Sequence, residues 1–403
     1  MVLDKFMKIC GIICEFNPLH NGHEHLIRVA KSKYDYVICL MSGNFTQRGK
    51  PTCLCKYDRA ALAITAGADM VLEFPTIFAV NGADEFAKHA IKILNNIGCN
   101  SILFGSESND EQGLEKMAAF KLTESKSFKH AIKKHMSDGN NYNQAYLLAM
   151  SDITHDKTLL KLASNPNDIL ASCYIKEIKK QKLKMNYDII KRLDNGYNDK
   201  TNNEKYLSAS SILELKNNSE DYSMFVPKNT FDALNHSSKF DYEKYFSLLQ
   251  YKITNSTAKE LSQIFGIDEG FENKIKHNIN LAKTYSELLI SLESKRYRKT
   301  RIEKMLYYIL IDLTKTNYNK LSKINAPLKV LAINDLSKND LLHLISKTKT
   351  KLITKNKDYN SLSKKHLLLS QYDQKATNIY SICTSQPLNK DLQTGLQIIK
   401  PNK

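Results

Sequence analysis

The sequence lacks any apolar run approaching the roughly 20 residues that a membrane-spanning helix requires. Residues 1–8 are short and mixed in charge, and they lack the apolar core of a signal peptide. These two absences favour a soluble protein of the cytoplasm that does not contact a membrane. With 403 residues, the chain is long enough for two domains and for a large core without staples.

The chain also lacks a second cysteine or histidine pair at zinc-finger spacing. Cys53 and Cys55 form a lone CxC motif. Several of the eight cysteines lie inside apolar runs, where a thiol behaves as a small hydrophobic group. We therefore expect no metal site built on cysteine.

Net charge is missing from the first part of the chain. Residues 1–110 hold 11 basic and 11 acidic side chains, so the whole net charge of +17 resides in residues 111–403. Such asymmetry indicates a polyanionic partner for the later part. The alternative is a genome rich in A and T, which favours lysine and asparagine codons.

Short apolar runs alternate with helical patterns over the first 110 residues. We expect strands at 9–14, 36–41, 70–74 and 101–104, and helices at 22–33, 56–66 and 83–97. This alternation predicts an α/β fold with a doubly wound parallel sheet. A turn-rich segment, 187–211, is expected to complete this domain, which we place at residues 1–215. Residues 216–403 are predicted to form a mainly helical basic domain, with one further strand at 328–333.

The first expected strand leads into His20-Asn21-Gly22-His23 and then directly into a helix. Ligands of doubly wound sheets bind at the carboxyl ends of the strands, and a helix N-terminus there attracts phosphate. Gly22 permits close backbone approach, while His20 and His23 lie on one side of the first helical turn. Two imidazoles in that position can donate hydrogen bonds to phosphate oxygens as charge develops. The motif predicts nucleotide binding with His20 and His23 as the catalytic residues.

Several motifs along the chain resemble those of the bacterial tRNA(Met) cytidine acetate ligases, which belong to the HxGH nucleotidyltransferase superfamily. Residues 11–23 carry GIICEFNPLHNGH, and further matches follow in order at 41–49, 67–75, 104–107, 166–170, 190–192, 208–212 and 295–302. The resemblance covers essentially the whole chain. It implies a Rossmann-like catalytic domain that adenylates acetate with ATP and releases pyrophosphate. The acetyl group would then pass to the wobble cytidine of elongator tRNA(Met), giving 4-acetylcytidine.

The resemblance also implies ATP contacts from the segment 13–26 and from three later residues. The expected ATP-binding residues are Ile13, Cys14, Glu15, Phe16, Asn17, Pro18, Leu19, His20, Asn21, Gly22, His23, Gly105, Asn167 and Arg192. An amide such as that of Asn167 can read an adenine edge, and the fork of Arg192 suits phosphate. Taken alone, Gly105 is equally typical of a turn, Asn167 is more typical of a turn or cap, and Arg192 is more typical of a solvated surface.

Two positions depart from the family pattern. Leu213 follows the serine-rich segment 208–212, where the family has a basic residue. The hydroxyl groups of Ser210 and Ser211 remain as ATP-binding candidates at the next helix start, and Lys216 is a replacement cation one turn later. At the second position, Asp168 stands where we expect asparagine, which weakens or redirects a base contact.

Other charged residues of the first domain have two interpretations each. Arg48 is either a phosphate or acetate partner or a solvated loop residue. Lys56 and Arg59 begin a helix, where cations oppose the dipole, so they indicate anion contact or a pairing with Asp58. A second pair, Asp69 and Glu73, suits either a magnesium ion or helix caps and salt bridges.

The basic second part contains the expected tRNA contacts. These are Lys295, Arg296, Tyr297, Arg298 and Arg301, at the start of an amphipathic helix. Arginine and lysine attract phosphate, and Tyr297 is predicted to stack on an unpaired base. Two other functions fit the chain less fully. A small-molecule adenylyltransferase needs no basic second domain, and an RNA-binding protein with a degenerate nucleotide domain need not keep both histidines.

Overall fold

The computed structural model describes residues 7–193 and 205–400. The strands are β1 (Ile9–Cys14), β2 (Tyr36–Ser42), β3 (Met70–Phe74), β4 (Ser101–Ser106), β5 (Asn186–Lys191), β6 (Leu328–Asn334), β7 (Leu352–Ile353) and β8 (Gln397–Ile399). Helices in the first half are α1 (Asn21–Lys33), α2 (Lys56–Thr65), α3 (Thr76–Ala79), α4 (Ala83–Asn96), α5 (Glu111–Leu122), α6 (Lys126–Ser137), α7 (Tyr142–Ile153), α8 (Lys157–Leu162), α9 (Pro166–Lys180) and α10 (Ala209–Asn217).

The second half is mainly helical. Its helices are η2 (Ser223–Phe225), α11 (Lys228–Asn235), α12 (Tyr242–Thr254), α13 (Ala258–Ser262), α14 (Phe271–Ile279), α15 (Tyr285–Leu292), α16 (Lys299–Ile311), α17 (Lys315–Leu321), α18 (Lys338–Ser346), η3 (Asn356–Ser361), α19 (Lys364–Cys383) and α20 (Lys390–Gln393). None of the helices in the described part has the length and apolar character that crossing a bilayer requires.

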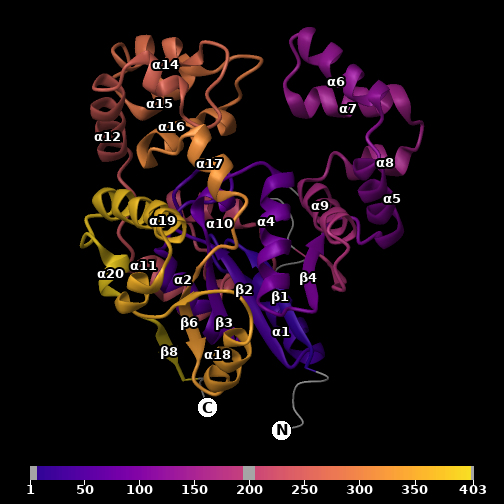
Figure 1. The fold of residues 1–403 in the computed structure, drawn as a ribbon, viewed down its shortest axis with the longest axis vertical. Helices are drawn as coiled ribbons and strands as arrows, with labels where there is room; N and C mark the ends of the chain where they lie inside the picture. The colour runs from indigo at the N-terminus through magenta and orange to yellow at the C-terminus, as the bar shows by residue number, and fades with distance from the viewer. Residues whose placement is uncertain (1–6, 194–204, 401–403) are drawn as a thin grey trace.

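One eight-stranded sheet forms the centre of the described chain, in the order β5-β4-β1-β2-β3-β6-β7, with β8 paired to β6 (Figure 1). The five strands from β5 to β3 run parallel. The chain reverses its direction of progress across the sheet between β1 and β4. In a doubly wound sheet this switch point, at the carboxyl ends of the strands, is where ligands bind.

The sheet is covered on both faces, which explains the apolar strands. All five residues of β3 are buried, and so are six of seven in β2. On α4, a stripe formed by Phe86, Ala90 and Ile93 is buried in the core. Each Å2 of apolar surface removed from water stabilises the fold by about 25 cal/mol, and this free energy drives the packing. The predicted α/β class with a doubly wound parallel sheet is confirmed.

The expected elements of the first 110 residues agree with the structure to within two residues at each end. The segment predicted as turn-rich, 187–211, instead contains β5 and the start of α10, while its residues 194–204 lie outside the described part. The expected strand at 328–333 is β6.

The second half of the chain extends the sheet of the first half. β6 pairs antiparallel with β3, and β7 and β8 pair parallel with β6. The predicted division between residues 215 and 216 stays a prediction. The strands β6, β7 and β8, which follow that division in sequence, belong to the same sheet as β1–β5.

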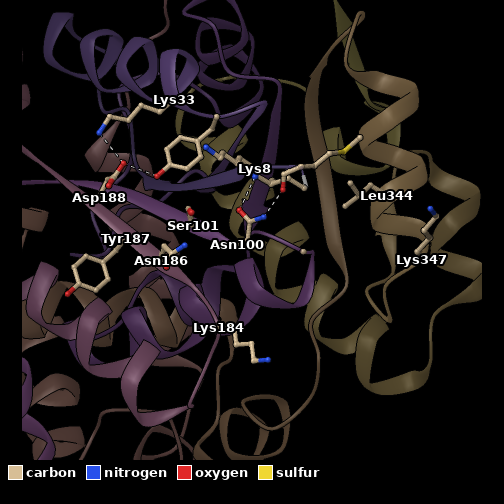
Figure 2. A pocket seen from close by; sticks show the side chains of 14 residues that line it. Lys8, Lys33, Asn100, Ser101, Lys184, Asn186, Tyr187, Asp188, Leu344 and Lys347 are labelled. Carbon is tan, nitrogen blue, oxygen red and sulfur yellow. Dashed lines mark hydrogen bonds and ion pairs between the residues drawn. The ribbon is translucent and has the colours of Figure 1, made fainter. Parts of the chain in front are cut away.

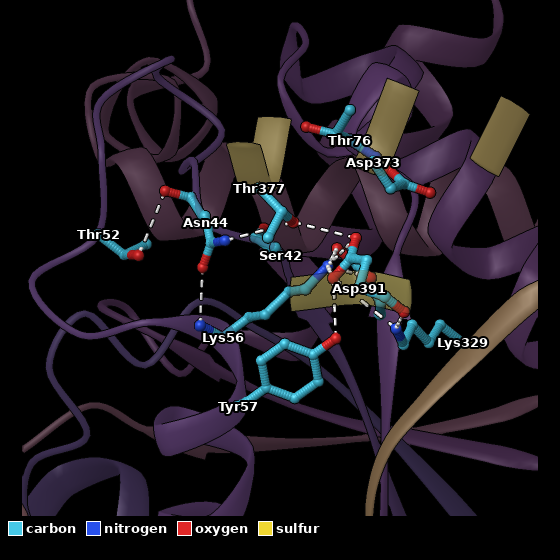
Figure 3. A network of polar contacts seen from close by, with 12 residues as sticks. Ser42, Asn44, Thr52, Lys56, Tyr57, Thr76, Lys329, Asp373, Thr377 and Asp391 are labelled. Carbon is cyan, nitrogen blue, oxygen red and sulfur yellow. Dashed lines mark hydrogen bonds and ion pairs between the residues drawn. The ribbon is translucent and has the colours of Figure 1, made fainter. Parts of the chain in front are cut away.

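Buried charges connect α2 with the C-terminal helices (Figure 3). The Lys56 ammonium donates to Glu73 at 2.7 Å and to Asp391 at 2.9 Å. Thr377 of α19 and Lys329 of β6 bind the same Asp391. Because a buried charge is tolerated only when it is paired, this cluster requires α19 and α20 to be docked on the sheet.

Two helical lobes rise beyond the carboxyl ends of the strands (Figure 1). One lobe consists of α5–α8, inserted between β4 and α9, and the other contains α12–α17. The lobes approach each other at Gly139 and Lys295, since a Cβ atom on Gly139 would lie 3.9 Å from Cδ of Lys295. The ligand end of the sheet therefore lies below two helical lobes.

Candidate active site

The HNGH motif forms the start of α1, at the carboxyl end of β1. His20 is the N-cap residue, and its Nδ1 accepts a hydrogen bond from the Gly22 N–H at 3.1 Å. Nδ1 of His23 accepts one from the His20 N–H at 3.4 Å. A neutral imidazole that accepts at Nδ1 carries its proton on Nε2. Both histidines are thereby set as Nε2–H donors at a helix N-terminus.

The two imidazoles lie against each other. Their ring centroids are 3.7 Å apart, and Phe16 meets His23 edge-on at 5.1 Å. Burial, followed by the charges of His20 and Arg192, holds the pKa of His23 well below its usual value of 6.5. The free protein therefore has a neutral His23, which donates a hydrogen bond without bringing a fixed charge.

The loop that precedes α1 is held from the β2 side. Phe16 adopts a left-handed backbone conformation with φ of 49°, which is uncommon for a bulky residue. The Glu15 carboxylate accepts from the Gln47 N–H at 2.6 Å, and the Asn17 side chain accepts from the Cys53 N–H at 2.7 Å. These contacts fix the direction in which the motif leaves β1.

A small cavity at the switch point gathers residues from the start of α1, from β4 and from the end of β5. Among its lining residues are five of the predicted ATP-binding set, namely His20, Gly22, His23, Gly105 and Arg192. Gly105 lies in β4 and Arg192 follows β5, so residues far apart in sequence meet where doubly wound sheets bind ligands. A Cβ atom on Gly105 would lie 2.9 Å from Cγ of Arg192, so the glycine makes room for the arginine.

Not every residue of the motif offers its side chain to a ligand. Cys14, Phe16 and Leu19 are buried in the core. The Cys14 thiol points to the Leu40 carbonyl, 3.8 Å away. Any nucleotide contact from these three residues is therefore made by the backbone.

Asn167 and Arg192 are joined through side chains. An Arg192 guanidinium N–H donates to the Asn167 amide oxygen at 3.0 Å. The Asn167 amide nitrogen donates to Glu107 at 2.6 Å, and the same carboxylate accepts the backbone N–H groups of residues 167 and 168. Glu107 lies in a family-like motif, but sequence reasoning gave it no role. Here it caps α9 and orients Asn167 toward Arg192.

Asp168 has a structural environment that explains its departure from asparagine. Its side chain is wholly buried and accepts from the Ser106 hydroxyl, the Ser108 N–H and the Asn165 amide. All of these partners are donors, which a carboxylate satisfies without offering a proton. Asp168 organises the turn after β4.

The serine-rich segment begins α10. Ser208 is the N-cap residue, and its hydroxyl lies 3.0 Å from that of Ser210 and 2.8 Å from that of Ser211. Asn21 donates to the carbonyls of Lys205 and Met224, which places the approach to α10 beside the start of α1.

Lys216 does not replace the basic residue that the family has at position 213, where this chain has leucine. Its ammonium binds the Leu234 carbonyl and reaches the Ser237 hydroxyl at 3.5 Å. That cation therefore serves the end of α11 rather than a phosphate.

The expectation that Lys56 and Arg59 contact an anion or pair with Asp58 is wrong. Lys56 pairs with Glu73 and Asp391. Arg59 is wholly buried and donates to four backbone carbonyls, among them Leu54 at 3.1 Å and Ser42 at 3.1 Å. Both cationic side chains at the start of α2 are thus bound by other groups of the protein.

Asp69 and Glu73 follow the salt-bridge interpretation instead of the magnesium one. Asp69 pairs with Lys31 at 2.7 Å and accepts from the Ser337 hydroxyl, whereas Glu73 pairs with Lys56. The Cα atoms of Asp69 and Glu73 are about 13 Å apart along the extended chain, and each carboxylate already has a lysine partner, so the two do not form a shared ion site. Among the described residues, no group of three histidine, cysteine or acidic side chains is arranged to hold a metal.

Arg48 is exposed at the ligand end of the sheet, in a loop that packs against α16 at Lys304. Gly49 follows it with φ of 80°, and a Cβ atom there would lie 3.1 Å from the Lys304 backbone. Burial and the nearby Arg48 lower the pKa of Lys304 to about 8. Burial raises the pKa of Glu15, while Arg48 and Lys304 act in the opposite direction. Lys304 is thus a second cation near the motif, one that sequence reasoning did not identify.

The basic cluster Lys295–Arg301 is partly exposed and partly used in packing. Lys295 and Arg298 are exposed, and Arg296, also exposed, pairs with Glu269. The prediction that Tyr297 stacks on a base is wrong. Its ring is only 7% exposed, stacks on Phe271 at 4.0 Å and is covered by the Arg301 guanidinium at 4.4 Å. Phe271 and Arg301 cover the faces of the Tyr297 ring on which a base would have to stack.

A second cavity, of about 1100 Å3, lies at the amino-terminal ends of the strands, opposite the candidate site (Figure 2). It is lined at the first residues of three strands, namely Ile9, Ser101 and Asn186. Asp188 on its wall already accepts from Lys33 and Tyr34, at 3.1 and 2.9 Å. Since ligands of such sheets bind at the carboxyl ends, this cavity is not the nucleotide site.

Known proteins similar to this chain share its whole length. The model of the HIGH Nucleotidyl Transferase family matches residues 7–394. The tRNA(Met) cytidine acetate ligase of Anoxybacillus flavithermus is 32% identical, over 95% of this chain and 96% of that protein. The enzyme of the same name from Clostridium perfringens is 34% identical, over 96% of this chain and 98% of that protein.

A solved structure shares the fold. The crystal structure of Thermotoga maritima TmcAL bound with alpha-thio ATP superposes with a TM-score of 0.86. It is 25% identical and covers 98% of this chain and 100% of the other. The chain therefore belongs to the HIGH nucleotidyl transferase family and, within it, to the tRNA(Met) cytidine acetate ligases.

Proposed function

We propose that this chain is an ATP-dependent ligase that acetylates the wobble cytidine of elongator tRNA(Met). An acetate oxygen attacks the α-phosphorus of ATP, forming acetyl-adenylate as pyrophosphate leaves. The exocyclic amine of the cytidine then attacks the acetyl carbonyl carbon. AMP leaves, the amine loses a proton, and 4-acetylcytidine results.

One observation carries this proposal. His20 and His23 stand as paired Nε2–H donors at the start of α1, beside Arg192 and Gly105, in a chain that aligns with curated tRNA(Met) cytidine acetate ligases over 95% of its length. The solved relative carries an ATP analogue. We infer that ATP binds here at the same place, with its phosphates at the helix N-terminus.

The site suits the first step because that step needs mainly positioning and charge stabilisation. Negative charge grows on the α-phosphate and on the leaving pyrophosphate as the bond breaks. The two Nε2–H groups and the Arg192 guanidinium are the donors we assign to it, and Ser210 and Ser211 lie at a neighbouring helix start. Losing one preorganised donor of this kind typically lowers the rate by about 100- to 1000-fold.

The second step places fewer demands on the protein. A mixed anhydride is already reactive, so holding the cytidine amine close to the acetyl carbon provides much of the acceleration. For the acceptor, we assign phosphate contacts to Lys295, Arg296, Arg298 and Arg301. Asp69 and Glu73 are each paired with a lysine, so a magnesium ion would be held by the ATP phosphates and not by these two carboxylates.

The test is incubation of the purified protein with ATP, labelled acetate and bulk bacterial tRNA, followed by nucleoside analysis. We expect label in 4-acetylcytidine, dependent on ATP. The matched variant His23→Ala should lose adenylate formation and keep tRNA binding.

Other outcomes would overturn the proposal. Pyrophosphate release without label in tRNA would indicate another acid or acceptor, as in a small-molecule adenylyltransferase. Binding of tRNA without ATP turnover would indicate an RNA-binding protein with a degenerate nucleotide domain. Full acetylation by His23→Ala would refute the assigned chemistry.

A further inference from the structure

Helix α6 presents a basic face that the nucleotide chemistry does not use. Four lysines lie on it, Lys126, Lys129, Lys133 and Lys134, and all are exposed. The helix contains no aspartate or glutamate. At 3.6 residues per turn, the four lysines and His130 fall on one side of the helix.

The other side of α6 is apolar and already occupied. Phe128 and Ile132 are buried, and Phe128 packs edge-on against Tyr146 of α7 at 5.1 Å. A helix that inserts into a membrane surface must keep its apolar stripe free. Because α7 covers this stripe, only the cationic face of α6 is available to a partner.

The lysines of this face have no acidic partners. In residues 7–193 and 205–400, none of the four ammonium groups forms an ion pair or a side-chain hydrogen bond, whereas Lys179 nearby pairs with Glu115 at 3.2 Å. Like charges three or four residues apart destabilise a helix by about 0.2–0.5 kcal/mol per pair. Lys126 also lies in the first turn, where the helix dipole disfavours a cation. An external polyanion would relieve both effects.

The position of α6 relates this face to the expected tRNA contacts. The turn that ends α6 contains Gly139, and a Cβ atom there would lie 3.9 Å from Cδ of Lys295. Lys295 begins the basic cluster of the other lobe. The end of α6 therefore lies beside the start of the basic cluster, beyond the ligand end of the sheet, where the two lobes rise in Figure 1.

We propose that the lysine face of α6 binds the sugar-phosphate backbone of the tRNA, from the lobe opposite the Lys295–Arg301 cluster. This inference rests on the proposed function. The two surfaces together hold the acceptor on both sides of the nucleotide site, so that the cytidine is presented to the adenylate. Lysine ammonium groups act here as point charges on phosphates, which supplies affinity rather than sequence discrimination.

The test compares two double variants of the full-length protein. Lys129→Gln with Lys133→Gln removes two of the four positive charges of the α6 face, and Lys157→Gln with Lys161→Gln removes two exposed lysines of the same lobe from α8. Binding of bulk bacterial tRNA is measured over a series of salt concentrations, and acetate-dependent adenylate formation is measured without tRNA. Circular dichroism checks that both variants are folded.

We expect the α6 variant to bind tRNA about tenfold more weakly at 0.15 M salt. The slope of log affinity against log salt should become shallower by about 1.4 to 1.8, since each lost phosphate contact removes about 0.7 to 0.9. The α8 variant should bind like the wild type, and both should form adenylate at the wild-type rate. That pattern supports the inference.

Wild-type tRNA affinity and slope in the α6 variant would refute this inference alone, provided that the wild type acetylates tRNA. Equal weakening by the α8 variant would also refute it, since the effect would then reflect net charge. Loss of binding to vesicles of anionic phospholipid, with tRNA binding unchanged, would assign the face to a membrane instead. A wild type that neither binds nor acetylates tRNA would refute both this inference and the proposed function.

Discussion

The ammonium of Lys56 lies 2.8 Å from a carboxylate oxygen of Asp391, although the residues are 335 positions apart. The Lys56 side chain is wholly buried and that of Asp391 is 2% exposed. Tyr57 donates to the same carboxylate at 2.8 Å. The last helix of the chain thus completes the core beneath the sheet that carries the nucleotide site.

Replacing Asp391 with asparagine should lower the free energy of unfolding by about 3–5 kcal/mol, because the buried ammonium of Lys329 loses its carboxylate partner and that of Lys56 keeps only Glu73. Urea denaturation measures this change. Asp188→Asn is the control, since its pair with Lys33 is exposed and should contribute less than about 1 kcal/mol. Similar small losses in both variants would show that the buried pair is not needed for stability.

Substitution of Gly105 by alanine should weaken ATP binding by tenfold or more. The added Cβ would lie 2.9 Å from Cγ of Arg192 and would displace the arginine from the cavity. Isothermal titration with ATP measures the effect. Gly82→Ala, where a Cβ meets nothing within 4 Å, is the matched control and should keep its affinity. Unchanged ATP affinity in Gly105→Ala would place the nucleotide elsewhere.

The depressed pKa of His23 predicts a pH dependence of stability. The unfolded chain takes up this proton near pH 6.5, but the folded chain does so only at lower pH. The folded state therefore loses stability as the pH falls below 6.5. His23→Asn should remove this loss, so the variant gains stability relative to the wild type between pH 7 and pH 5. Urea denaturation across that range measures the difference.

Saturating ATP provides a check on the same imidazole. Phosphate beside His23 favours its charged form and should raise its pKa. The loss of stability below pH 6.5 should therefore be smaller with ATP than without it. Two results would contradict the site assignment. One is a wild-type pH profile of stability that parallels that of His23→Asn in the absence of ATP, and the other is a wild-type loss of stability below pH 6.5 that ATP does not reduce.

Substitutions of two neighbouring residues in the basic cluster, Tyr297 and Arg298, should have different effects on stability and on tRNA binding. Tyr297→Leu should destabilise the fold, because the ring packs between Phe271 and Arg301, but the folded protein should still bind tRNA. Arg298→Gln should keep its stability and bind tRNA more weakly, with a shallower salt dependence. Denaturation and tRNA binding are measured on both. Loss of tRNA binding without loss of stability in Tyr297→Leu would restore the base-stacking role.

The sequence by itself determined the elements that carry the candidate nucleotide site. The first strand, the HNGH turn and the first helix depend on local features, namely a continuous apolar run followed by residues that cap a helix. The structure places His20, Gly22 and His23 together with Gly105 and Arg192, as the family pattern implied. The strand, the turn and the helix can be predicted from the sequence because their formation depends on residues that are close together in the chain.

Only the tertiary structure decided which charged and aromatic residues are free to bind. Lys56 and Arg59 look like anion ligands in sequence, but Asp391 and buried carbonyls engage them. Tyr297 looks like a stacking residue, but Phe271 covers it. Pairing of β6 with β3 joins segments more than 250 residues apart. The partners in each case are distant in the chain, and no local pattern encodes which distant residue will arrive.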